Sequence, residues 1–118
     1  MKTVALAYLL VVSFACKFSS STQQKVTNPI EDIAWIKAYI EETTKSPFPT
    51  KAMITQYTYN NETVYLVDGC HQCPDAPSFL YNAKKETLCI FGGMIANTNN
   101  CPDFLEKATD ETLLWKSF

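Results

Sequence analysis

The spacing of apolar residues changes along the chain, and each change marks a predicted element. Ile33, Ile36 and Ile40 recur at helical spacing. They place apolar side chains on one face, which predicts a helix over residues 29–44. This helix is the first element of the folded region.

Local sequence marks both ends of this helix. Asn28 can cap it, Pro29 suits its first position and Glu31 completes a capping box. Pro47 and Pro49 follow its expected end and cannot continue it. We therefore expect one continuous helix.

After the helix, apolar and polar residues alternate in short runs, which is typical of strands. Asn60 and Asn61 separate the first two runs, and Asn adopts the positive φ of a tight hairpin turn more readily than most residues. A short helix over residues 101–107 precedes the final strand. The predicted strands form two hairpins and one single strand: 52–59 with 63–67, 78–82 with 87–91, and 112–116.

These elements predict an α+β fold, in which one N-terminal helix packs on an antiparallel β-meander of four to five strands. We expect the other face of the sheet to be open to solvent. Tyr57, Tyr59 and Tyr65 suit such a face, because the ring covers apolar surface while the hydroxyl stays in water. Together with Asn97 and Asn99 of the loop before the short helix, they form the candidate binding surface.

The N-terminal region has the character of an export signal. Lys2 precedes an uncharged apolar run that ends at Ala15, shorter than the about 20 residues that cross a bilayer. This run predicts a secretory signal peptide over residues 1–15. Residues 16–27 are rich in Ser, Thr and Gln, which predicts a disordered tether. One domain, residues 28–118, remains.

Cys16 ends the apolar run in the segment Ser13-Phe14-Ala15-Cys16, which resembles the lipobox of bacterial lipoproteins. Ser13 and Phe14 depart from the residues that the lipobox prefers. The resemblance implies that Cys16 carries lipid, so that acyl chains tether the protein to a membrane surface. We therefore expect an exported protein of the bacterial cell envelope, anchored to a membrane, with the outer membrane as the expected site.

Charge excludes one class of partner. The chain has 10 Lys and Arg residues against 12 Asp and Glu, for a net charge of −2, and none of the ten is Arg. Because there is no basic stripe and no guanidinium to fork onto phosphates or bases, we expect no nucleic-acid binding.

The cysteine count predicts cross-links. If Cys16 is the lipid anchor, four of the five cysteines remain, and an even number in a small exported domain implies two disulfides. Closing a longer loop removes more entropy from the unfolded chain. We therefore expect Cys70 and Cys73 to bond separately, each to Cys89 or Cys101.

Residues 64–115 resemble a small family of uncharacterised bacterial exported and lipoprotein domains. The resemblance rests on VYLVDGCHQC, FLYN, LCIFGG, CPDF and LLW. The family pattern commonly has two adjacent cysteines, whereas His71 and Gln72 are inserted between them here. Because adjacent cysteines rarely bond to each other, the resemblance also implies separate partners for Cys70 and Cys73. It implies no activity.

The same residues allow two other chemistries. Cys70 and Cys73 enclose the single histidine, His71, and a CxxC thiolate beside a histidine is a reactive thiol in thiol–disulfide oxidoreductases. The four cysteines with His71 also contain enough ligands for a zinc site. The sequence predicts no parallel βαβ unit, the setting in which a redox CxxC motif is usually found. It also has no second paired cysteine motif, which a zinc site usually has.

The sequence thus favours a non-enzymatic domain with a binding or structural role, without a cofactor or metal. Its expected partners are the membrane, through the lipid, and an envelope protein or glycan. The alternative is an exported thiol–disulfide oxidoreductase that uses Cys70 and Cys73.

Overall fold

The computed structural model describes residues 25–93 and 99–118. The predicted signal peptide, Cys16, most of the predicted tether and Asn97 lie outside the described residues. None of the helices within the described ranges has the length and apolar composition that a membrane crossing requires. The elements are the helices α1 (Pro29–Asp32), α2 (Ala34–Lys45) and α3 (Phe104–Lys107), and the strands β1 (Met53–Tyr59), β2 (Glu62–Asp68), β3 (Ser78–Tyr81), β4 (Thr87–Phe91) and β5 (Thr109–Lys116).

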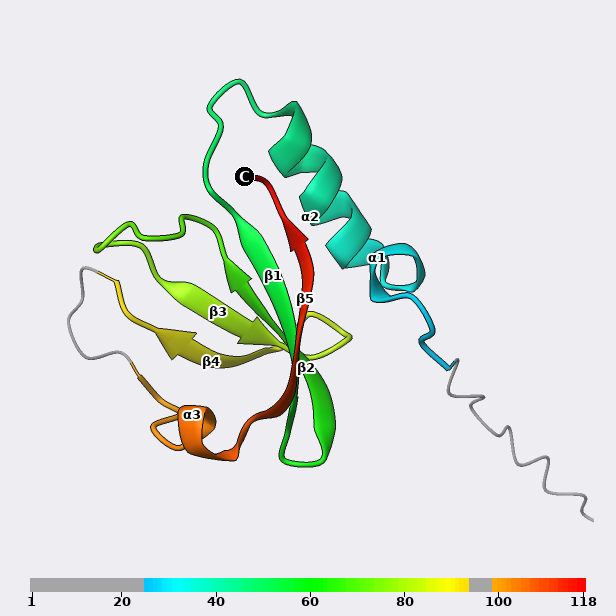
Figure 1. Cartoon of the computed structure of the whole chain (residues 1–118), viewed down its shortest axis with the longest axis vertical. Helices are drawn as coiled ribbons and strands as arrows, with labels where there is room; N and C mark the ends of the chain where they lie inside the picture. The colour runs from blue at the N-terminus through cyan, green and yellow to red at the C-terminus, as the bar shows by residue number, and fades with distance from the viewer. Residues whose placement is uncertain (1–24, 94–98) are drawn as a thin grey trace, which may run out of the picture.

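The strands form one antiparallel sheet in the order β4-β3-β2-β1-β5 (Figure 1). The turn between β1 and β2 has positive φ at both central residues, 50° at Asn60 and 60° at Asn61. This is the backbone that a two-residue hairpin turn requires. The chain then returns to place β5 beside β1, so that the first strand lies inside the sheet. The α+β fold and its five strands are confirmed.

The predicted single helix is two helices. Ile33 has an extended backbone, with φ −104° and ψ 103°, and separates α1 from α2. Asn28 caps α1 as expected, since its Oδ1 accepts a hydrogen bond from the Ile30 N–H at 3.2 Å. The carboxylate that bonds back to the backbone before the helix belongs to Asp32, and not to Glu31 of the predicted capping box. The Oδ2 atom of Asp32 accepts from the backbone N–H groups of Thr27 and Asn28, each at 2.9 Å.

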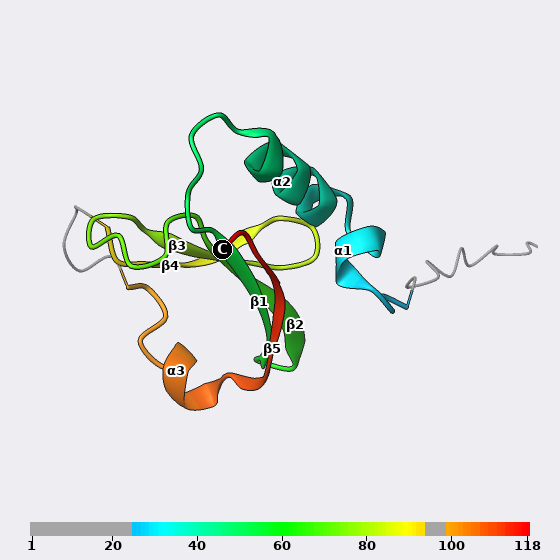
Figure 2. The ribbon, with the colours of Figure 1, turned by 45° about the horizontal axis from the view of Figure 1, so that its top comes forward.

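A helix-side core joins α2 to one face of the sheet (Figure 2). Trp35 fastens this layer because its ring packs edge-on against Tyr65 and Tyr81, with centroids 6.1 and 5.3 Å away. Its Nε1 also donates to the Ala83 carbonyl in the β3–β4 turn at 3.0 Å. The buried members of this core are Ile33, Ile36, Ile54, Tyr65 and Val67.

Part of the opposite face of the sheet is covered by α3, which corrects the expectation that this face is open to solvent (Figure 2). Phe104 of α3 is buried, and its ring lies 5.1 Å from that of Tyr57 and 5.2 Å from that of Tyr59. The Tyr59 hydroxyl donates to Asp103 Oδ1 at 2.6 Å. This second core therefore depends on residues that follow β4. Its buried members are Tyr59, Val64, Leu80, Cys89 and Phe104.

Candidate functional site

The cysteines pair with near neighbours, so the expected separate pairing of Cys70 and Cys73 is wrong. Cys70 bonds to Cys73, with Cα atoms 5.5 Å apart. Cys89 bonds to Cys101, with Cα atoms 5.7 Å apart. Spatial proximity decides the pairing instead of loop length, because Cys89 and Cys101 both belong to the second core, whereas Cys70 and Cys73 belong to neither core. The structure therefore separates the two pairs that a shared zinc site would need. Within the described residues no group of three or more potential metal ligands lies together.

The Cys70–Cys73 bond closes a tight loop after β2. The Cys73 N–H donates to the Cys70 carbonyl at 3.1 Å, and Gln72 between them has φ 66°. Asp68, the last residue of β2, anchors this loop. Its carboxylate accepts from the Cys70 N–H at 3.2 Å.

His71 is held by three separate contacts. Its Nδ1 lies 3.2 Å from Asp68 Oδ2, and its N–H donates to the Lys51 carbonyl at 2.6 Å. Its ring stacks on Phe118 at a centroid distance of 5.4 Å and an interplanar angle of 12°. These contacts hold the His71 side chain and the loop around it in one position.

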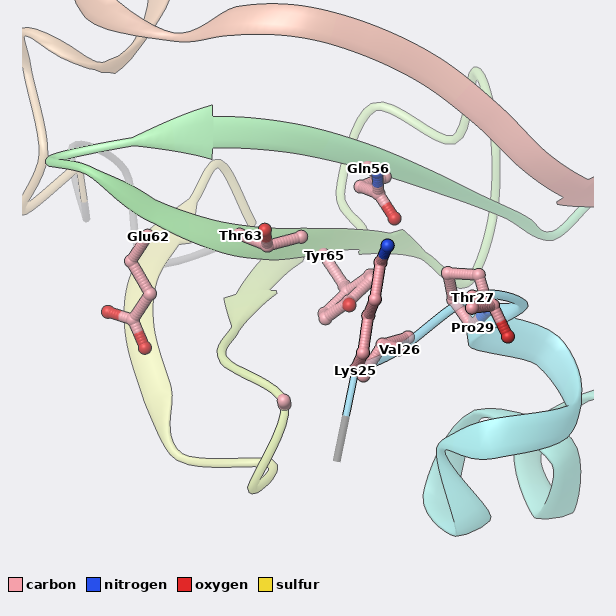
Figure 3. A pocket seen from close by; sticks show the side chains of 9 residues that line it. Lys25, Val26, Thr27, Pro29, Gln56, Glu62, Thr63 and Tyr65 are labelled. Carbon is pink, nitrogen blue, oxygen red and sulfur yellow. The ribbon is translucent and has the colours of Figure 1, made fainter. Parts of the chain in front are cut away.

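A polar cleft of about 560 Å³ lies on the helix side of the sheet, beyond the N-terminal end of α1. Figure 3 shows the Lys25 side chain extending from the N-terminal segment toward Gln56, across Tyr65. Thr63 and Glu62 lie further along β2, toward the β1–β2 turn (Figure 3). The lining residues are Lys25, Val26, Thr27, Pro29, Gln56, Glu62, Thr63, Tyr65 and Ala83.

Tyr65 contributes the most buried side chain of this cleft. The residue is only 1% exposed, and Trp35 fixes its ring from the helix side. Burial raises the pKa of its hydroxyl above the ordinary value of 10.0. Within the described residues that hydroxyl has no hydrogen-bond partner, although it borders the cleft. The Tyr65 hydroxyl is neutral and can donate a hydrogen bond to a group inside the cleft or accept one from it.

A second, apolar cavity of about 320 Å³ lies on the α3 side of the sheet. Leu105 of α3 is 90% exposed at its rim. Asn99 also borders it, and its Oδ1 accepts from the Cys101 N–H at 3.0 Å. Besides Asn99 and Leu105, the lining residues are Leu66, Ser78, Phe91, Cys101, Pro102 and Phe104.

The residues expected to form one binding surface lie on two faces. Tyr57 and Tyr59 pack around Phe104 on the α3 side, with Asn99 near that side, whereas Tyr65 lies on the helix side. Alternation along β2 contained the signal, because Tyr65 shares its face with Thr63 and Val67. The cleft itself was missed, since the N-terminal segment that forms one wall reads as tether.

Comparison with known proteins gives a family and nothing more specific. A family model described as a domain of unknown function (DUF6970) matches residues 38–117. This range contains all five strands and both disulfides. No curated protein and no solved structure matches the chain.

Proposed function

Since the chain belongs to the DUF6970 family, a domain of unknown function, we propose a function from its geometry: a non-enzymatic envelope domain that binds a saccharide in the polar cleft. The observation that carries the proposal is the Tyr65 hydroxyl, which borders the cleft on a side chain only 1% exposed. The described residues contain no buried side-chain oxygen without a hydrogen-bond partner, so this hydroxyl oxygen is open to the cleft and can bond to a ligand there.

The other polar groups of the cleft suit sugar hydroxyls, which both donate and accept. Lys25 offers donors only, Glu62 offers acceptors only, and Gln56 and Thr63 offer both. One positive and one negative group leave no net charge in the lining. A phosphate or another strongly charged ligand therefore finds no complementary field there.

The lining also supports binding without chemistry. Glycoside hydrolysis needs two carboxyl groups that flank the scissile bond. Among the nine described lining residues, Glu62 is the single carboxylate. A sugar in this cleft is therefore held and not cleaved.

The disulfides and the N-terminal sequence support the proposed location. Two disulfides are compatible with an exported protein, because oxidising compartments preserve them. The signal-like N-terminus and Cys16 support a lipid anchor at the cell envelope. An envelope glycan is the saccharide that such a protein meets.

The test is isothermal titration of the processed protein with soluble oligosaccharides prepared from peptidoglycan strands and from lipopolysaccharide cores. Tyr65→Phe removes the hydroxyl alone, and the fold should survive because that hydroxyl bonds to no described protein group. We expect this variant to weaken binding about 5- to 10-fold, as expected for one lost hydrogen bond of about 1–1.5 kcal/mol.

Tyr81→Phe is the matched control. Tyr81 lies on the same face of the sheet and packs against Trp35, but it does not line the cleft. Its affinity should stay within about twofold of the unaltered protein, below the loss from one hydrogen bond. Failure of every oligosaccharide to bind, or equal binding by Tyr65→Phe and the unaltered protein, would overturn the proposal.

A further inference from the structure

The two disulfides have different surroundings. Cys89 is fully buried, with 0% exposure, inside the second core. Its partner Cys101 is partly exposed but packs against that core. Cys70 and Cys73 are both partly exposed and belong to neither core. A sulfur must be reached by an incoming thiolate before a disulfide can exchange. Both cysteines of the Cys70–Cys73 pair are partly exposed, whereas only one cysteine of the other pair is, so access favours the Cys70–Cys73 bond.

Contacts other than the Cys70–Cys73 bond hold the surrounding sheet and loop. The β2–β3 ladder continues to the edge of the loop, with Asp68 opposite Ser78 and Val67 opposite Phe79. The loop keeps its own anchors, namely the hydrogen bond from His71 to Lys51 and those to Asp68. None of these hydrogen bonds involves either sulfur atom.

We propose that the Cys70–Cys73 disulfide is a redox-exchange site that accepts two electrons from a dithiol. One thiolate of the dithiol attacks a sulfur of the pair, forms a mixed disulfide and releases the other sulfur as a thiolate, which takes a proton. The second thiol of the substrate then loses its proton and attacks the mixed disulfide. The substrate ends as a disulfide, and Cys70 and Cys73 end as two thiols.

The His71 ring, between the two cysteines in the chain, is held in one orientation. Its Nδ1 lies 3.2 Å from Asp68 Oδ2. The ring is further fixed by the stack on Phe118. This site lies at the end of β2 that is opposite to the polar cleft, since Glu62 and Thr63 of the cleft begin the strand. The proposal is therefore independent of saccharide binding.

The first experiment compares the two bonds within the folded protein. The full chain is incubated in dithiothreitol buffers, quenched with acid and alkylated, and each cysteine is assigned by peptide mass spectrometry. We expect Cys70 and Cys73 to be alkylated about 10-fold faster than Cys89 and Cys101, because exchange follows access. Circular dichroism should show an unchanged fold at that stage. Simultaneous reduction of both pairs, or earlier reduction of Cys89 and Cys101, would overturn the proposal.

The second experiment tests transfer. A reduced peptide with its own CxxC dithiol is mixed with the oxidised protein, and the disulfide form of the peptide is measured. One equivalent per chain should form with the unaltered protein. The double variant Cys70→Ser, Cys73→Ser should form none, whereas the matched variant Cys89→Ser, Cys101→Ser, once shown to be folded, should retain the transfer. No peptide oxidation by the unaltered protein would equally contradict the site.

Discussion

Removal of each disulfide in turn should destabilise the domain by different amounts, and the structure predicts which loss is larger. The Cys89–Cys101 bond closes a loop with a sequence separation of 12, which the chain-entropy model values at about 3 kcal/mol. The Cys70–Cys73 bond closes a separation of 3, worth about 2 kcal/mol in the same model. Replacement of the fully buried Cys89 by Ala adds about 1 kcal/mol for lost core contacts.

The double variant Cys89→Ala, Cys101→Ala should therefore lose about 4 kcal/mol, and Cys70→Ala, Cys73→Ala about 2 kcal/mol. Urea unfolding with linear extrapolation measures both values. The slope m should rise more in the first variant, because a longer loop is released in its unfolded chain. In thermal unfolding the difference should exceed about 8 °C for a domain of this size. Equal losses, or a larger loss for the CxxC pair, would refute the reasoning.

Three further predictions concern the core, the pH dependence and the anchor. Ile36→Ala should cost about 3 kcal/mol in urea unfolding because Ile36 is fully buried, and an unchanged midpoint would contradict the helix-side core. The Tyr59 hydroxyl and the Lys107 ammonium lower the pKa of Asp103 below its ordinary value of 3.8. Asp103 therefore stabilises the fold above that pH and loses this effect as the pH falls through its lower folded value, so that Asp103→Asn should flatten the acid limb of a plot of stability against pH. Cys16→Ser should leave the protein in the soluble fraction after cell lysis, and its continued sedimentation with membranes would argue against lipidation.

Local features of the fold were predictable because they depend on neighbouring residues. The Asn60-Asn61 turn and the strand over residues 87–91 follow from positive-φ tolerance and from alternation. The division of the helix at Ile33 was hidden because an isoleucine there fits the apolar spacing of a continuous helix. At the break, Asp32 bonds back to the N–H groups of Thr27 and Asn28, and Ile33 is buried in the helix-side core.

The remaining features depend on contacts between distant residues, which composition and period do not encode. The pairing of Cys89 with Cys101 requires β4 and the segment before α3 to meet on one face. The position of Tyr65 in the polar cleft requires β2, the β3–β4 turn and the N-terminal segment to meet on the other. Strand parity placed Tyr65 and Tyr59 on different faces only once the pairing of β1 with β2 was known.

The position of β5 beside β1 has a consequence for how the domain folds. The Ala52 N–H donates to the Ser117 hydroxyl oxygen across 65 residues of chain, and Trp115 of β5 packs against the helix-side core. The hairpins can form from local contacts, whereas this closure must overcome the loop entropy of almost the whole domain. Folding should therefore end with the pairing of β5 with β1, and a chain in which this pairing has not formed lacks part of the helix-side core.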